Sequence, residues 1–184
     1  MPVQTPICDF GKKALPFELK STDNKIISLD DIKGENGTLI MFICNHCPYV
    51  KAVTKEIVED CNELKKIGIN SVAICSNDFI NYPDDSFDNM IKFSKDNQFS
   101  FPYLQDETQE IAKAYDAVCT PDFFGYDKNL GLQYRGRLRE LKNFVPVKDG
   151  ESDLLKAMKQ IAETNKGPKD QIPSAGCGIK WKFS

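Results

Sequence analysis

Two cysteines three positions apart, Cys44 and Cys47, are the residues of this chain whose types and spacing most directly indicate chemistry. They stand in the segment FICNHCPYV, with the only histidine of the chain, His46, between them and Pro48 directly after. Residues at positions i and i+3 of a helix have Cβ atoms roughly 5–6 Å apart, so a small adjustment permits a disulfide. The spacing predicts a redox-active dithiol and leaves two alternatives open, part of a metal site and a peroxide-reacting thiol.

The position of the pair in the chain predicts which sulfur ionises. The apolar run before it indicates a strand that ends near Ile43, with Cys44 at the start of a helix, where unpaired N–H groups and the helix dipole favour a thiolate. We therefore expect Cys44 to have a pKa between about 3.5 and 7.5 and to attack substrate disulfides, and Cys47 to resolve the mixed disulfide. His46 is expected to stabilise that thiolate. Pro48 suits the first helical turn, whose N–H groups have no intrahelical acceptor.

Length and composition indicate an ordinary globular protein. The 184 residues are 41% hydrophobic and 28% charged, which predicts a single domain over residues 1–184. A net charge of −3 gives no reason to expect nucleic acid or an anionic membrane as a partner. The N-terminus lacks an apolar signal segment and no run approaches membrane-spanning length, so a cytoplasmic location is expected. Seven irregularly spaced cysteines do not form the pattern of a secreted disulfide scaffold.

Hydrophobic periodicity predicts an α/β fold around the dithiol. Residues 15–33 indicate an N-terminal β-hairpin, and 38–43 and 71–75 are apolar runs typical of strands buried on both faces. The apolar repeat from 50 to 64 predicts a helix between them. Strand, helix and strand together form a βαβ unit, which should be parallel and right-handed.

The second half of the chain continues the same alternation and ends in a tail. The patterns predict, in order, a helix over 84–97, a helix from 106 to 118, an antiparallel hairpin over 122–136 and a helix over 154–162. Residues 166–184 are rich in Gly, Pro and Lys and are expected to be an irregular tail. Trp181 and Phe183 suggest that this tail packs back on the body.

With the dithiol at a strand-to-helix junction, the chain resembles the thioredoxin-like superfamily. Within it, the chain is similar to the redoxin branch, which holds the alkyl hydroperoxide reductase/thiol-specific antioxidant (AhpC/TSA) proteins and the peroxiredoxin-like proteins. The segments that carry the resemblance cover most of residues 8–140: FELKSTDNKIISLDDIKG, FICNHCPYVK, SNDFINYPDD, FPYLQDETQEIAKAYDAVCTPDFF and YRG. The closing GCGIKW resembles the tail of an uncharacterised peroxiredoxin-like subgroup.

The resemblance implies a thioredoxin-like fold, a central mixed β-sheet flanked by helices, and thiol–disulfide oxidoreductase activity. Its partners would be protein or small-molecule disulfides and dithiols and an external thiol reductant, with no cofactor. It also implies a cis-proline loop facing the dithiol, which Thr120-Pro121 matches, so that residue 120 can pair with an extended substrate chain. Cys119 would lie close by, as a structural thiol or a third reactive sulfur.

The same resemblance raises a thiol peroxidase as the alternative function, with a hydroperoxide as substrate and Cys47 as the peroxidatic cysteine. The pair Cys47-Pro48 matches the end of the peroxiredoxin pattern P-x-x-x-T-x-x-C. However, Cys44 occupies the threonine position and Ile40 the proline position, so the hydroxyl that would orient peroxide is absent. Arg135 could stand in for the arginine that activates the thiolate, or it could contact solvent on an edge strand. The sequence therefore favours dithiol exchange.

A metal site is the third alternative, since Cys44, His46 and Cys47 are ligand types for zinc or copper(I). Structural zinc usually takes four ligands from two paired clusters, and no second pair occurs, so no bound metal is expected. Cys177 in the tail is a further candidate ligand, and it could also be a resolving thiol that reaches the dithiol when the tail folds over it. A pure interaction module would not need a second thiol at the CxxC spacing.

Overall fold

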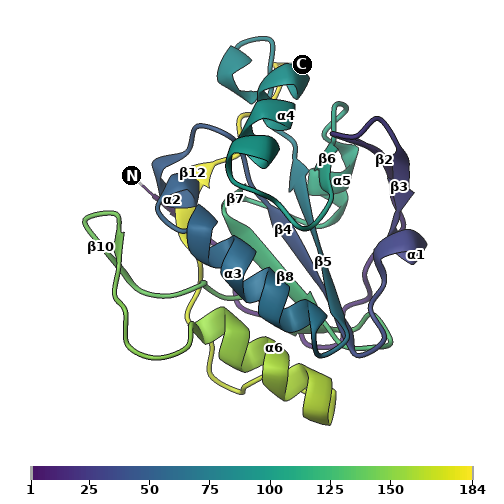
Figure 1. The fold of residues 1–184 in the computed structure, drawn as a ribbon, viewed down its shortest axis with the longest axis vertical. Coiled ribbons are helices and arrows are strands. Elements are labelled where there is room, and N and C mark those ends of the chain that lie inside the picture. The colour runs from purple at the N-terminus through teal and green to yellow at the C-terminus, as the bar shows by residue number, and fades with distance from the viewer. Residues whose placement is uncertain (1, 184) are drawn as a thin grey trace.

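The structure of the protein, a computed structural model, describes residues 2–183. A mixed sheet runs through its centre (Figure 1), and its strands lie in the order β3 (Ile26–Ser28), β2 (Glu18–Ser21), β6 (Tyr103–Gln105), β5 (Ile69–Cys75), β4 (Gly37–Phe42), β8 (Asp122–Tyr126) and β9 (Leu132–Tyr134). The helices are α1 (Leu29–Ile32), α2 (Pro48–Lys51), α3 (Thr54–Lys65), α4 (Phe87–Asp96), α5 (Glu110–Ala114) and α6 (Asp153–Thr164), with a short 3₁₀ turn η1 at Pro83–Asp85.

Two smaller sheets flank this body. One has the strand order β1 (Val3–Gln4), β12 (Ala175–Gly178) and β7 (Cys119–Thr120), and the other joins β10 (Leu141–Lys142) to β11 (Val145–Pro146). None of the helices within residues 2–183 is long and apolar enough to cross a membrane.

The central strand β4 is buried along its whole length because helices cover both faces of the sheet. Leu39 and Met41 pack with α3, α4 and α6, whereas Ile40 and Phe42 pack with α1 and α5 on the opposite face. This alternation is the two-residue period of a strand, and burial on both faces explains why the segment reads as one continuous apolar run. β4 pairs in parallel with β5 and antiparallel with β8, which confirms the predicted mixed sheet and βαβ unit.

Several element boundaries differ from the sequence-based expectation. The helix expected over 50–64 is two helices, α2 and α3, interrupted at Ala52–Val53. The helix expected over 84–97 begins only at Phe87, because Pro83–Asp85 forms the η1 turn and Ser86 then caps α4. The helix expected over 106–118 is reduced to α5, although Asp106 still accepts hydrogen bonds from two amides near its start. The predicted hairpins, β2–β3 and β8–β9, are confirmed.

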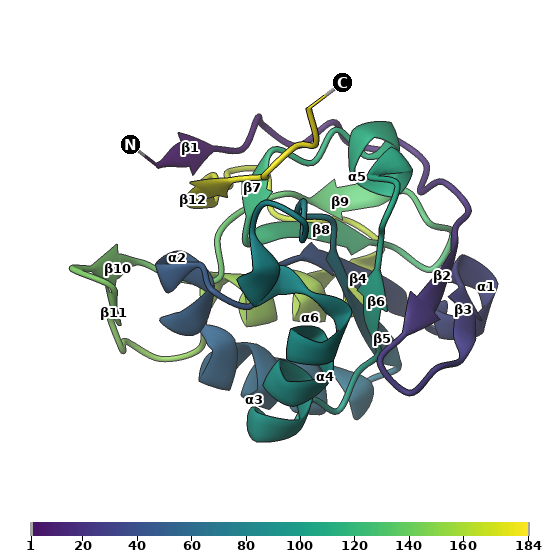
Figure 2. The same cartoon turned by 90° about the horizontal axis from the view of Figure 1, so that it is seen from above.

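The tail is more regular than predicted. Its strand β12 lies between β1 and β7, which Figure 2 shows in yellow beside the start of the chain. The tail packs on the body as expected, and Trp181, which is 39% exposed, lies under the ammonium group of Lys113, whereas Phe183 is 90% exposed. Strand pairing holds the tail, together with buried Ile179 and the side-chain amide of Gln109, which hydrogen-bonds the backbone of residues 180 and 182.

The contact between α3 and α6 generates a prediction about stability. Asp60 accepts a hydrogen bond from Ser152, the N-cap of α6, and burial raises the pKa of Asp60 from 3.8 to about 6. One pKa unit is worth about 1.4 kcal/mol, so the free energy of unfolding should fall by up to about 3 kcal/mol as the pH rises and Asp60 ionises in the folded protein. Asp60→Asn, which keeps a hydrogen-bond acceptor, should remove this fall. Denaturant unfolding at about pH 4 and about pH 7 measures it; equal pH dependence in both proteins would contradict it.

Candidate functional site

The dithiol lies where the chain leaves β4 and turns into α2. Cys44 stands in the loop after β4, and Cys47 is the N-cap of α2, with an extended backbone and Pro48 at the first helical position. Proline is favoured there because its fixed φ suits a helix and its missing N–H has no acceptor to lose. The helix therefore starts three residues later than the sequence predicted, and its N-terminal amides lie at Cys47 rather than at Cys44.

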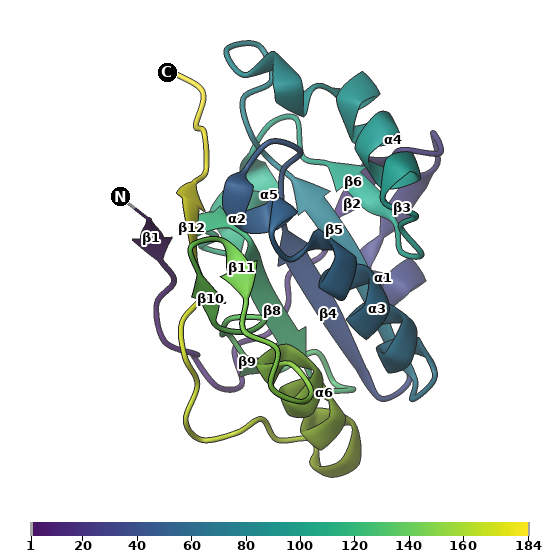
Figure 3. The same cartoon turned by 60° about the vertical axis from the view of Figure 1, so that its left-hand side comes forward.

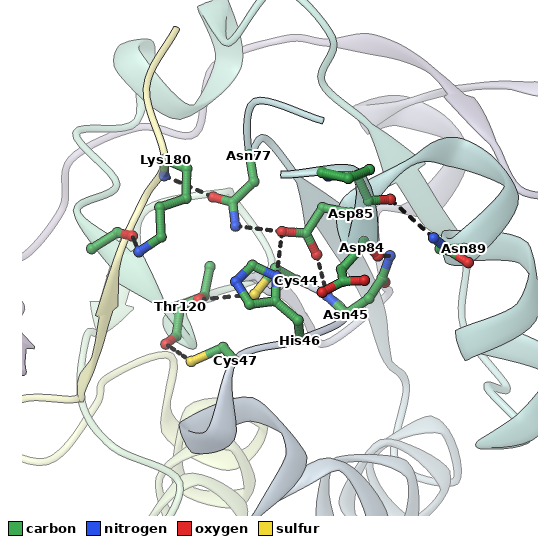
Figure 4. Close-up of polar contacts among 12 residues, drawn as sticks. Cys44, Asn45, His46, Cys47, Asn77, Asp84, Asp85, Asn89, Thr120 and Lys180 are labelled. Carbon is green, nitrogen blue, oxygen red and sulfur yellow. Dashed lines mark hydrogen bonds and ion pairs between the residues drawn. The ribbon is translucent and has the colours of Figure 1, made fainter. Parts of the chain in front are cut away.

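Thr120 contacts both sulfurs from the neighbouring loop (Figure 4). Its hydroxyl oxygen lies 3.4 Å from the sulfur of Cys44, and its carbonyl oxygen lies 3.3 Å from the sulfur of Cys47. The Thr120–Pro121 bond is cis, as predicted. The two cysteines and this loop thus form one cluster, although 73 residues separate Cys47 from Thr120 in the chain.

The surroundings of the two sulfurs differ in how they treat a negative charge. Interaction with the Cys44 thiol lowers the pKa of Cys47 to about 4. The same interaction, burial and the charge of Asp85 raise the pKa of Cys44 well above its ordinary range. The sequence analysis expected the thiolate at Cys44, whereas these surroundings favour Cys47, because the helix N-terminus lies at Cys47 and a buried carboxylate lies near Cys44.

The Cys47 thiol donates a hydrogen bond to the Thr120 carbonyl oxygen at 3.3 Å. The Val50 amide of α2 helps to lower the pKa of this thiol. A thiol with a lowered pKa is held ready as a nucleophile.

Asp85 is the functional residue that the sequence analysis missed. It is buried, accepts hydrogen bonds from the backbone N–H of Asn45 at 2.8 Å and the side chain of Asn77 at 2.9 Å, and so fixes the loop between the two cysteines. Its Oδ2 lies 2.7 Å from Nδ1 of His46, although the two atoms do not form a hydrogen bond. The available signal was the acidic end of SNDFINYPDD, one of the segments that carries the family resemblance.

The comparison with known proteins decides the family. Residues 10–139 match the AhpC/TSA family. This chain belongs to the AhpC/TSA family. That membership supports a redox enzyme in general terms. No curated protein matches the chain.

Two solved structures resemble this AhpC/TSA protein over its full length. An uncharacterised conserved protein from Geobacillus kaustophilus is 44% identical, and the match covers 100% of this chain and 98% of that one with a TM-score of 0.93. A hypothetical protein from Sinorhizobium meliloti 1021 is 30% identical, with 100% of both chains covered and a TM-score of 0.91.

More distant structures share the fold. A thiol:disulfide interchange protein of the thioredoxin family from Chlorobium tepidum is 16% identical, with a TM-score of 0.64 over 83% of this chain and 97% of that one. Peroxidoxin BcpB from Mycobacterium tuberculosis is 14% identical, with a TM-score of 0.59 over 83% and 92%. These similarities establish the thioredoxin-like fold of the AhpC/TSA protein.

Three side chains of the AhpC/TSA protein could offer ligands to a cation. Cys44, His46 and Asp85 place one ligand atom each within 4.8 Å of one another. Closed structural zinc sites use four ligands, and both oxygens of Asp85 already accept amide hydrogen bonds. These three side chains alone therefore do not complete a closed structural zinc site.

Arg135 and Cys119 are both buried and have other contacts. The guanidinium of Arg135 forms two hydrogen bonds with Asp122, at 2.9 and 3.2 Å, and a third with the Asp116 carbonyl. It thus compensates a buried carboxylate, rather than contacting solvent at an edge strand. Burial raises the pKa of Cys119, whose sulfur lies 3.6 Å from the Pro121 carbonyl. These are the features of a structural thiol.

The dithiol of the AhpC/TSA protein is covered. Cys44 is 1% exposed and Cys47 is 0% exposed. The tail strand β12 lies beside α2 (Figure 3), with Cys177 in register with Thr120. A hollow of about 230 Å³, lined by Tyr49, Pro121 and Ser174 among others, opens next to this cover. Access to the sulfurs therefore depends on the tail.

The unequal pKa values of the pair predict a specific pattern of titration. Cys44→Ala should raise the pKa of Cys47 well above about 4, because it removes the interaction that lowers this pKa most. Cys47→Ala should leave no thiol of the pair that ionises in acid, because Cys44 alone is buried beside Asp85. Alkylation rates followed against pH, with the modified cysteine identified by mass spectrometry, measure both effects.

Cys8→Ser is the matched control, because this half-buried thiol lies outside the cluster. It should leave the titration of the pair unchanged. An acid-range titration that survives Cys47→Ala and disappears in Cys44→Ala would show that the charge is on the other sulfur.

Proposed function

We propose that this protein is a thiol–disulfide oxidoreductase that uses Cys44 and Cys47 as its redox dithiol. The observation that carries the proposal is the position of the two sulfurs: both contact Thr120, Cys47 caps α2, and Cys44 lies within 4.8 Å of the buried Asp85 carboxylate. A pair prepared in this way contains both a nucleophile and a second thiol close enough to complete the exchange.

In the proposed reaction the Cys47 thiolate attacks one sulfur of a disulfide R–S–S–R′. A Cys47–S–S–R bond forms, the S–S bond of the substrate breaks, and R′–S⁻ leaves and takes a proton from solvent. The roles of the two cysteines are the reverse of those expected from the sequence, because the charge lies on Cys47. The Val50 amide, which donates to the Cys47 carbonyl oxygen, helps to lower the pKa of the attacking sulfur.

Cys44 then resolves the mixed disulfide. Its sulfur attacks Cys47, the Cys44–S–S–Cys47 bond forms, and R–S⁻ leaves and becomes R–SH. The proton of Cys44 has a nearby acceptor, because one atom each of His46 and Asp85 lies within 4.8 Å of the Cys44 sulfur. We assign these two residues to proton transfer at Cys44. An external thiol reductant would restore the dithiol, in keeping with the cytoplasmic location that the sequence predicts.

A thiol peroxidase that uses Cys47 is the second candidate. The low pKa of Cys47 and its position directly before Pro48 favour it. Two features disfavour it: Cys44 replaces the hydroxyl that would orient peroxide, and Arg135 is bonded to Asp122. These contacts support dithiol exchange over peroxide reduction.

The proposed function predicts the effect of removing each sulfur. With a model disulfide and a thiol reductant, Cys47→Ser should reduce turnover to the uncatalysed rate, because the nucleophile is lost. Cys44→Ser should stop the cycle before the Cys44–Cys47 bond forms and leave Cys47 trapped in a disulfide with another thiol. Cys8→Ser should retain the turnover of the unmodified protein. Absence of a reversible Cys44–Cys47 disulfide in the unmodified protein would refute the proposal. Peroxide consumption that needs Cys47 and survives Cys44→Ser would establish the peroxidase instead.

The role of Asp85 has its own prediction. Asp85→Asn keeps an acceptor for the Asn45 amide but removes the charge, so it should slow the resolution step by about a hundredfold, within the usual range for lost general-base catalysis. It should also lower the pKa of Cys44, because the charge of Asp85 raises it. Rapid-mixing measurements of mixed-disulfide decay against pH test both. A change in stability with an unaltered pH profile would reduce Asp85 to a structural residue.

A further inference from the structure

The tail strand occupies the backbone edge beside the dithiol. β12 pairs antiparallel with β7, with Cys177 opposite Thr120 and Gly178 opposite Cys119. Gly176 packs so closely that a Cβ atom there would lie 2.0 Å from the Thr120 carbonyl oxygen and 3.1 Å from the Pro121 nitrogen. The edge at residue 120, where the sequence analysis expected an extended substrate chain, is therefore filled by the chain itself.

This pairing brings a third sulfur to the dithiol. Cys177 lies opposite Thr120, whose carbonyl oxygen is 3.3 Å from the sulfur of Cys47, and it packs against the buried cluster that contains Cys44 and Cys47. Cys177 is also more accessible than Cys44 and Cys47, because it is only partly buried whereas they are fully covered. An external disulfide would meet Cys177 before it could meet Cys47.

We propose that Cys177 is the third redox thiol of this site and passes disulfide bonds between the outside and the buried pair through a Cys47–Cys177 disulfide. The inference rests on the proposed dithiol function and extends it. In this relay β12 occupies the position beside Thr120 that an extended substrate would take. Cys177 is then the cysteine that Cys47 attacks.

Each step conserves atoms and electrons. The Cys177 sulfur attacks an external disulfide R–S–S–R′ and forms Cys177–S–S–R. The proton of Cys177 goes to the departing R′–S⁻, which leaves as R′–SH. The Cys47 thiolate then attacks the Cys177 sulfur, forms Cys47–S–S–Cys177, and expels R–S⁻, which takes a proton from solvent. Cys44 attacks Cys47, forms the Cys44–Cys47 disulfide, and its proton ends on the released Cys177. The external disulfide is reduced by two electrons and the pair is oxidised by two.

The filled edge also indicates the class of substrate. An extended polypeptide would have to displace β12 before it could pair with Thr120. A small disulfide such as oxidised glutathione needs to reach only the partly exposed Cys177. The relay therefore favours disulfides of low molecular mass.

Removing Cys44, whose sulfur attacks last in the relay, should trap the Cys47–Cys177 disulfide. Cys44→Ser treated with oxidised glutathione should accumulate an internal Cys47–Cys177 disulfide, seen as a mass loss of two hydrogens and located by peptide mapping. Cys44→Ser with Cys177→Ser should instead hold glutathione on Cys47 or stay reduced. In the otherwise unmodified protein, Cys177→Ser should slow oxidation of the Cys44–Cys47 pair by oxidised glutathione. Cys8→Ser should have no effect in either background.

Two glycines in β12 offer a matched pair of variants that leave every sulfur in place. Gly176→Ala should push β12 off Thr120 and lower the yield of the Cys47–Cys177 disulfide in the Cys44→Ser background. Gly178→Ala should keep the yield, because a Cβ there meets only Val3, at an ordinary distance of 3.5 Å. Thermal unfolding of both variants shows whether the body remains folded. Equal yields in the two variants would overturn the role of β12.

Different experimental results would refute the Cys177 relay and the dithiol function. If Cys44→Ser holds glutathione on Cys47 while Cys177 stays free, and Cys177→Ser is oxidised at the unmodified rate, the relay is refuted and the dithiol function stands. If the unmodified protein forms no Cys44–Cys47 disulfide at all, the dithiol function is refuted first.

Discussion

Competition between two buried sulfurs for one proton is the constraint on which this site depends. Burial and the charge of Asp85 raise the pKa of Cys44, whereas Cys47 stands at the start of α2 and has a lowered pKa. Neither effect alone determines which of the two sulfurs has the lower pKa. A desolvated thiol resists ionisation wherever it lies, and backbone amides at a helix start favour the anion only for a sulfur that they reach. Because the two effects act on cysteines only three residues apart, they favour the thiolate at Cys47 and the protonated thiol at Cys44.

The surrounding fold supplies the partners of that proton. β4 ends at Phe42, so the loop with both cysteines emerges at one end of a strand that is buried along its length. Thr120 comes from β7 and Asp85 from the η1 turn, each far from the cysteines in the chain. Because β4 pairs with β5 on one side and β8 on the other, the loops that follow β5 and precede β8 must reach the same place. The mixed topology of the sheet thus assembles the site.

The tail makes this site unlike an open dithiol. Strand pairing requires only a free edge and a partner of compatible shape, and β12 satisfies both because Gly176 lacks a side chain where it crosses Thr120. The same closure that excludes solvent from the sulfurs strengthens the electrostatic interactions between them. A buried dithiol can exchange disulfide bonds with external molecules only through an accessible group. In the proposed relay this group is the Cys177 thiol of β12.

The sequence by itself determined the class of fold, the dithiol and the loop that faces it. Apolar runs of two distinct periods specify strands and helices locally, and CxxC followed by proline is also a local pattern. The class of fold and the dithiol could therefore be predicted without knowledge of tertiary contacts. The sequence did not determine which sulfur ionises, the part played by Asp85, or the path of the tail. Those depend on where Pro48 starts the helix, on a carboxylate 40 residues from Asn45 along the chain, and on an edge that residues 175–178 reach only after folding. Charge and access act through space over a few ångströms, and only the tertiary structure decides which groups come that close.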